Sequence, residues 1–189
     1  MITALLITST ACLSDNFQKG LDASQKGDYS TAIKEWTPLA KQGDADAQYA
    51  LGAMYFAGYG VSQNYHTAVK WYTLAAEQGN SNAQFNLGVM YGKGQGVSQN
   101  FQTAIKWYTL AASQGNALAQ FNLGLMHNRG QGVSKDQVRA HMWLNLSALT
   151  GHKKAAKLRD IVAENLTDRN LSDAQRFARE CIAKNYKGC

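Results

Sequence analysis

The sequence contains one proline, Pro38, and few charged residues: 17% of its 189 residues are charged, against about 25% in an average globular domain. It has no stretch rich in Val, Ile and Thr of the kind that β-sandwiches and barrels need. No apolar run reaches the roughly 18–20 residues of a membrane-spanning helix. These absences argue against an all-β fold and a transmembrane segment, while 45% hydrophobic residues allow a buried core.

Glycine, alanine, leucine and aromatic residues are abundant instead, which suits closely packed helices. The net charge is +6, and most of the excess falls in residues 152–189. Such a basic segment could favour anionic partners, but its basic and acidic side chains alternate, as on a solvated helix face. Zinc motifs and glycine-rich phosphate loops are missing, so we expect no nucleic-acid partner.

The first residues resemble an export signal. Residues 1–13, MITALLITSTACL, are apolar and rich in small side chains, and Ser14-Asp15 follows them. A positively charged start is missing, since the first basic residue is Lys19. We expect residues 1–14 to be a signal peptide that directs a bacterial protein to the periplasm or the medium. Two alternatives stay open: lipidation at Cys12, and an uncleaved helix in a cytoplasmic protein.

The cysteines agree with export. If the segment that carries Cys12 is removed, Cys181 and Cys189 remain as a pair. An even number of cysteines fits a disulfide in an oxidising compartment. Two free thiols in a reducing cytosol are the alternative. Neither cysteine has a histidine at metal-ligand spacing, so we expect no metal site and no cofactor.

An internal repeat of 36 residues dominates the sequence. Residues 44–79 and 80–115 share 23 identities in 36 positions, and residues 80–115 and 116–151 share 18. Each unit reads as two helices. The first contains a glycine, Gly52, whose recurrence suggests that a partner helix crosses too closely for a β-carbon. Gly58 and Gly60 supply positive φ after it, and Asn64 is a plausible N-cap of the second helix.

The recurring positions form a long and specific motif: Ala47-Gln48, Leu51-Gly52, Met54-Tyr55, Gly58-Tyr59-Gly60-Val61, Ala68, Trp71-Tyr72, Ala75-Ala76 and Gly79. This motif resembles the Sel-1-like repeat (SLR) family, whose members are related to tetratricopeptide repeats. The resemblance implies an all-α fold, a right-handed α/α solenoid (superhelix) of antiparallel helix hairpins. It also implies a scaffold rather than an enzyme.

The flanking segments complete the expected domain organisation. Residues 15–43 look like a tetratricopeptide-like hairpin that precedes the three repeats, 44–79, 80–115 and 116–151. Residues 152–189 lose the period and are expected to be C-terminal capping helices, one at about 152–166 and one at about 173–185. Ser172 and Gln175 have the spacing of a capping box before the last helix.

The candidate site is the concave face that stacked hairpins present. By resemblance to tetratricopeptide repeats, the first helix of each hairpin lines this face, and Ala50 and Ala53 would be exposed there. The expected partner-binding residues are aromatic, aliphatic and carboxamide side chains of these helices: Tyr49, Phe56, Phe85, Asn86, Val89, Phe121, Asn122 and Leu125. Rings and amides together would suit a peptide. The recurring aromatics could instead fill the seam between repeats.

The sequence offers no catalytic motif. No two of the four histidines lie three or four residues apart, and His127 and His141 occupy positions that hold Tyr and Ile in the preceding repeat. We therefore expect no catalytic residues, and we interpret the chain as an exported, monomeric, non-enzymatic adaptor for a protein or peptide. The alternative is a cell-wall enzyme or β-lactam-binding protein. A branch of the resembled family is linked with penicillin binding, but it carries a cysteine pair in each repeat, which 44–151 lack.

Overall fold

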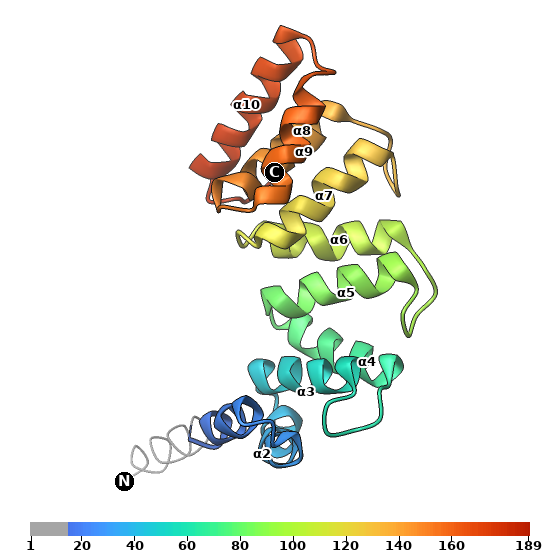
Figure 1. The fold of residues 1–189 in the computed structure, drawn as a ribbon, viewed down its shortest axis with the longest axis vertical. Helices are drawn as coiled ribbons and strands as arrows, with labels where there is room; N and C mark the ends of the chain where they lie inside the picture. The colour runs from blue at the N-terminus through green and yellow to red at the C-terminus, as the bar shows by residue number, and fades with distance from the viewer. Residues whose placement is uncertain (1–14) are drawn as a thin grey trace. The chain divides into compact units, whose positions relative to one another are not determined.

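The computed structural model describes residues 15–189, and within this range the regular structure is entirely helical (Figure 1). The all-α prediction is therefore confirmed. The chain divides into two compact units. Among the described residues, the N-terminal unit comprises residues 15–83 and Gln95–Val97, and the C-terminal unit comprises Gln84–Gly94 and Ser98–Cys189. The expected signal segment, including Cys12, lies outside the described residues.

The N-terminal unit contains helical residues 15–25 followed by α2 (Tyr29–Lys41), α3 (Ala45–Ala57) and α4 (Tyr65–Glu77). Neighbouring helices pack as hairpins, α2 on α3 and α3 on α4. Each of these three helices begins at an Asp or Asn whose side chain accepts a hydrogen bond from the backbone three residues later, as Asn64 does from Thr67 at 2.9 Å. The expected N-cap at Asn64 is confirmed.

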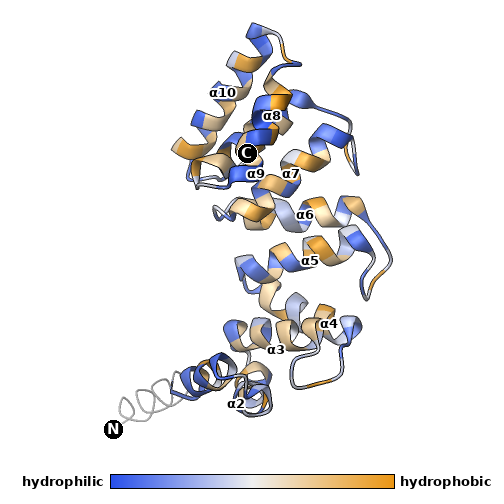
Figure 2. Ribbon diagram, in the orientation of Figure 1, coloured by the Kyte–Doolittle hydropathy of each residue, from blue (hydrophilic) through white to orange (hydrophobic). Residues whose placement is uncertain are grey.

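The C-terminal unit holds the remaining helices. They are α5 (Ser81–Lys93, in this unit from Gln84 onward), α6 (Phe101–Ala112), α7 (Ala117–Arg129), α8 (Gln137–Leu149), α9 (Lys153–Ala163) and α10 (Asp168–Ala183). Buried alanines, leucines and methionines of α6, α7 and α8 form its core, and Ala178 and Cys181 of α10 join them. Hydrophilic and hydrophobic residues alternate along α10 (Figure 2), because only one face of this helix meets the core.

The recurring helix glycine has the packing role that the repeat predicts. A β-carbon at Gly52 would come within 2.6 Å of the Tyr72 ring, and one at Gly88 within 2.5 Å of the Tyr108 ring. Real β-carbons do not approach other atoms so closely, so the side chain of the second helix excludes any larger residue. The glycine thus lets the two helices of a hairpin approach each other.

The turns inside the hairpins also follow the prediction. Gly58 and Gly130 end α3 and α7 in the left-handed conformation, with φ of 76° and 69°. The N–H of Asn64 donates to the carbonyl of Tyr55 at 2.9 Å, and the N–H of Asn100 makes the same bond to Tyr91. Each loop is therefore closed by one backbone bond to the last turn of the first helix.

Buried glutamines form hydrogen bonds within and between hairpins that the sequence did not suggest. Gln48 is 3% exposed, donates to the carbonyl of Ala40 at 3.0 Å and accepts from Gln78 at 2.8 Å. In the next repeat, Gln114 donates to Gln84 at the same distance. These bonds satisfy amide groups that would otherwise be costly to bury.

The C-terminal helices differ from their predicted bounds. Helix α10 begins at Asp168, and the Thr167 hydroxyl accepts from the N–H of Asn170 at 3.3 Å. The capping box predicted at Ser172 is wrong, because this residue lies inside the helix. Helix α9 ends at Ala163, three residues earlier than expected. The earlier N-cap extends α10 by more than one turn.

The structure contains the Cys181–Cys189 disulfide, with the two Cα atoms 5.4 Å apart. The bond ties the end of the chain back to α10, where Cys181 is buried. Within residues 15–189, no helix is both long and apolar enough to cross a membrane.

Candidate functional site

The first helices of the second and third repeats, α5 and α7, border an open groove of about 450 Å³ within the C-terminal unit. We call it the α5–α7 groove. Apolar, amide and basic side chains line it together with one tyrosine and one glycine: Val89, Gly92, Lys93, Gln99, Phe101, Tyr108, Asn122, Leu125, Met126, Arg129 and Gln131. The structure therefore brings Val89, Asn122 and Leu125, three of the expected binding residues, to one cavity.

The Asn122 side chain lies next to Tyr108, which lines the same groove. Tyr108 is 6% exposed, and this burial raises the pKa of its hydroxyl to about 12, an effect that a hydrogen bond with the Asn122 side chain partly opposes. The carboxamide of Asn122 therefore lies next to the Tyr108 hydroxyl at the groove wall. Asn86, one repeat earlier, is half-buried and forms no side-chain hydrogen bond within the part of the chain that the structure describes.

Phe85 and Phe121 lie beside the groove residues on α5 and α7 but do not line the cavity. The Phe85 ring packs on Tyr108 with 5.9 Å between centroids, and the Phe121 ring packs on His152 at 4.7 Å. Both phenylalanines are half-buried. Their rings therefore contribute to packing inside the unit and still expose part of their surface, so the seam and the groove interpretations both remain.

The two expected residues on α3 belong to the N-terminal unit. Tyr49 packs on Tyr72 with 5.8 Å between centroids, and Phe56 packs on Tyr65 at 5.4 Å. Both are half-buried. Ala50, which the sequence placed on the exposed face, is only 8% exposed, so that prediction is wrong. The α3 helix of the first repeat therefore presents less free surface than the sequence suggested.

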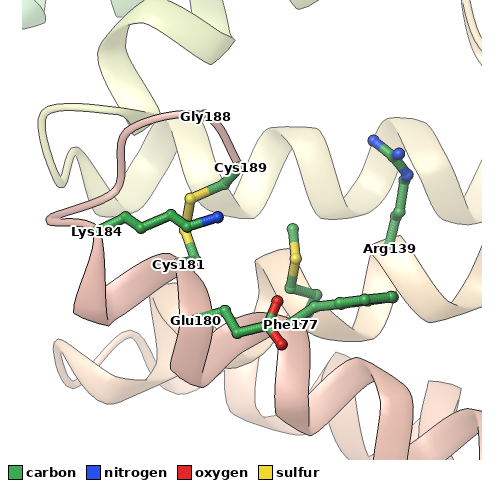
Figure 3. A pocket seen from close by; sticks show the side chains of 8 residues that line it. Arg139, Phe177, Glu180, Cys181, Lys184, Gly188 and Cys189 are labelled. Atoms are coloured by element: carbon green, nitrogen blue, oxygen red, sulfur yellow. A yellow bond between two sulfur atoms is a disulfide. The ribbon is translucent and has the colours of Figure 1, made fainter.

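A second, smaller pocket of about 130 Å³ lies beside the disulfide (Figure 3). Arg139 and Met142 of α8, residues of α10 and the tail at Gly188 line it. Figure 3 shows Lys184 and Arg139 on opposite sides of this pocket. Sequence reasoning missed it, because α8 and α10 are separated by a whole helix in the chain.

His127 and His141 lie in packing positions, whereas His66 is exposed. Burial lowers the pKa of His127 and of His141, which favours their neutral forms. His152 is half-buried and caps α9 by accepting from the N–H of Ala155 at 3.0 Å. No group of three His, Cys, Asp or Glu side chains within residues 15–189 could hold a metal ion.

The helix hairpins, their glycine contacts and their closed loops define a tandem α-hairpin repeat protein. Residues 45–80, 81–116 and 117–152, more than half of the chain, match the Sel1 repeat. The chain belongs to the Sel1 repeat family, as the sequence motif predicted. Members of this family are generally protein-interaction scaffolds and are typically non-enzymatic.

The solved structures that are similar to the chain include two helical repeat proteins. One is a Sel1 repeat protein from Oxalobacter formigenes, with 30% sequence identity and a TM-score of 0.76 over 87% of this chain and 75% of that one. The other is c5321, described as a protective antigen present in uropathogenic Escherichia coli strains and displaying an SLR fold. It has 27% identity and a TM-score of 0.56 over 92% of this chain and 47% of its own length. No curated protein matches the chain.

Proposed function

We propose that this chain is an exported, monomeric, non-enzymatic adaptor that binds a segment of a partner protein in the α5–α7 groove. The observation that carries the proposal is the convergence of Val89, Asn122 and Leu125 on one open cavity. Aliphatic side chains there would bury apolar surface of the partner, and the Asn122 amide can donate to or accept from a peptide backbone.

The other expected binding residues would make additional contacts with the partner. Asn86 occupies on α5 the repeat position that Asn122 occupies on α7. Phe85 and Phe121 flank the groove, where their half-buried rings could extend the apolar contact. Tyr49 and Phe56 lie in the N-terminal unit, and we assign them to a separate contact with the same partner.

Partner capture tests the proposal. The full chain is expressed in its native host and cross-linked, and co-purifying proteins are identified by mass spectrometry. The Val89→Ser/Leu125→Ser variant should lose one specific partner. A matched variant, Leu110→Ser/Leu149→Ser, changes two exposed leucines on α6 and α8 that lie outside the groove and should retain it. A partner captured equally by both variants would contradict the groove assignment.

Phe85 separates the seam interpretation from the groove interpretation. A Phe85→Ala change removes the contact with Tyr108 and should lower stability in either case. If the ring also contacts the partner, affinity measured well below the melting temperature should fall as well. Unchanged affinity with lowered stability would restrict Phe85 to packing.

Export is tested by the mass of the mature protein from the same purification. The proposal expects that residues 1–14 are missing and that Cys181 and Cys189 are joined. The disulfide in the structure is compatible with a location outside the cytoplasm. A full-length protein recovered from the cytoplasm with two free thiols would contradict export.

A further inference from the structure

Two cations border the α5–α7 groove without a neighbouring acid. Lys93 ends α5 and Arg129 ends α7, and both side chains are exposed and line the cavity. No Asp or Glu is among the lining residues. Within residues 15–189, neither Lys93 nor Arg129 has an ion pair, whereas Arg139 and Arg159 each have one and Arg176 has two.

The repeat period shows that this arrangement is confined to two repeats. Lys93 and Arg129 are 36 residues apart and therefore occupy the same repeat position, which is Ala57 in the first repeat. In the first repeat, alanines also occupy the positions of Asn122 and Leu125; they are Ala50 and Ala53.

These positions form a stripe along each first helix. In α5 the stripe is Asn86, Val89 and Lys93, which lie three and four residues apart and so share one helix face. The corresponding α7 stripe ends in Arg129. Each helix thus presents an amide, an aliphatic side chain and a cation in the same order. Several buried positions of the first helices, by contrast, are identical in all three repeats, as Leu51, Leu87 and Leu123 are.

We propose that the segment bound in the α5–α7 groove is an extended peptide in which Asp or Glu side chains neighbour an apolar residue. This inference rests on the proposed function and specifies the partner's chemistry. Val89 and Leu125 receive the apolar side chain, and the Asn122 amide binds the peptide backbone. Lys93 and Arg129 each pair with a carboxylate, and Arg129 can do so through two parallel N–H donors.

A defined peptide assay tests this inference. Short random peptides displayed on phage are selected on the full chain, and the enriched sequences are synthesised with acetylated and amidated ends, so that only side chains carry charge. We expect enriched sequences that combine Asp or Glu with Leu, Ile or Phe. Replacing their acids by Asn or Gln should weaken binding about tenfold, and affinity should fall as salt rises.

Protein variants identify the cations involved. Lys93→Ala/Arg129→Ala should weaken binding about tenfold, since two exposed pairs are lost. The control Lys106→Ala/Lys157→Ala removes the same net charge from exposed positions of α6 and α9, and should bind as the wild type does. In addition, Lys93→Glu/Arg129→Glu should prefer the peptide in which the acids are replaced by Lys. All these side chains are exposed, so circular dichroism should report unchanged helicity.

The outcomes separate this inference from the proposed function. Peptides that require Leu125 but ignore the change at Lys93 and Arg129 would overturn the acidic-segment inference and leave the groove as the binding site. Peptides indifferent to both sets of changes, or no enriched peptide at all, would contradict the groove itself. If Lys93→Ala/Arg129→Ala and the control Lys106→Ala/Lys157→Ala lost the same affinity, the effect would come from net charge alone, and the acidic-segment inference would be overturned.

Discussion

The ring of Tyr108 lies directly against the backbone of Gly88, so that a β-carbon at residue 88 would come within 2.5 Å of it. The ring belongs to α6 and the glycine to α5. The same relationship joins Tyr72 to Gly52 in the first repeat. Hairpin geometry in this protein therefore depends on a helix glycine that is poor for helix formation but necessary for packing.

Gly88→Ala is accordingly expected to destabilise the C-terminal unit. Overpacking costs about 1–3 kcal/mol, which outweighs the gain of about 1 kcal/mol in helix propensity. Gly92, in the same helix, is the matched control: its β-carbon would meet only Ala104 at 3.8 Å and the Tyr108 hydroxyl at 4.0 Å. Gly92→Ala should leave stability unchanged or raise it by up to about 1 kcal/mol. Urea unfolding followed by circular dichroism measures both, and equal effects would contradict the packing argument.

The glutamine contacts predict a stabilising change in the third repeat. Gln120 is fully buried, and its side-chain oxygen has no partner within the described chain. In the second repeat, Gln114 donates a hydrogen bond to Gln84, the residue equivalent to Gln120. In the third repeat, the position of Gln114 is occupied by Thr150. Because Gln78 and Thr150 have nearly the same backbone conformation, a glutamine fits there. Thr150→Gln should raise the free energy of unfolding by about 1 kcal/mol.

The reverse exchange is the control for this prediction. Gln114→Thr removes the donor to Gln84 and should lower stability by about the same amount. Thermal unfolding of the two variants and the wild type gives the comparison. If Thr150→Gln were neutral while Gln114→Thr destabilised, the oxygen of Gln120 would have to be satisfied in another way.

Periodicity accounts for how much of the fold the sequence could predict. A residue that recurs at 36-residue spacing occupies the same environment in each hairpin, so the role of Gly52 could be extended to Gly88 and Gly124. Residues outside the repeats have no equivalent position elsewhere in the chain with which they can be compared. The start of α10 was therefore misplaced: Ser172 and Gln175 have the spacing of a capping box, but Thr167 caps the helix first.

The binding site was predictable only in part, because its composition depends on contacts between repeats. Asn122 and Leu125 could be named from their places on a helix face. Lys93 and Arg129 could not, since a cation in the last turn of a helix is common and interacts favourably with the helix dipole. Only the packing of α5 and α7 in one unit brings the two cations to a shared groove.

The disulfide should contribute measurably to the stability of the C-terminal unit. Its two cysteines are eight residues apart, and closing a loop of this size stabilises by about 2–3 kcal/mol through the entropy of the unfolded chain. Thermal unfolding of the wild type with and without a reducing agent should show a lower midpoint after reduction. The Cys181→Ala/Cys189→Ala variant, unaffected by the reductant, is the control. Equal midpoints for oxidised and reduced protein would mean that the tail is held by its packing alone.

The buried histidines predict that the protein loses stability as the solution is acidified. Burial, and to a smaller degree Arg159, lowers the pKa of His141 below its ordinary value of 6.5, and burial has the same effect on His127. Between the folded and unfolded pKa values the unfolded chain binds more protons, so the free energy of unfolding rises with pH there. The stabilisation is complete above pH 6.5 and is lost as the pH falls through the folded pKa.

His127→Tyr/His141→Ile, which restores the residues of the second repeat, should flatten the dependence of the free energy of unfolding on pH below pH 6.5. Urea unfolding at a series of pH values measures this slope, and an unchanged slope in the variant would assign the acid sensitivity to the carboxylates instead.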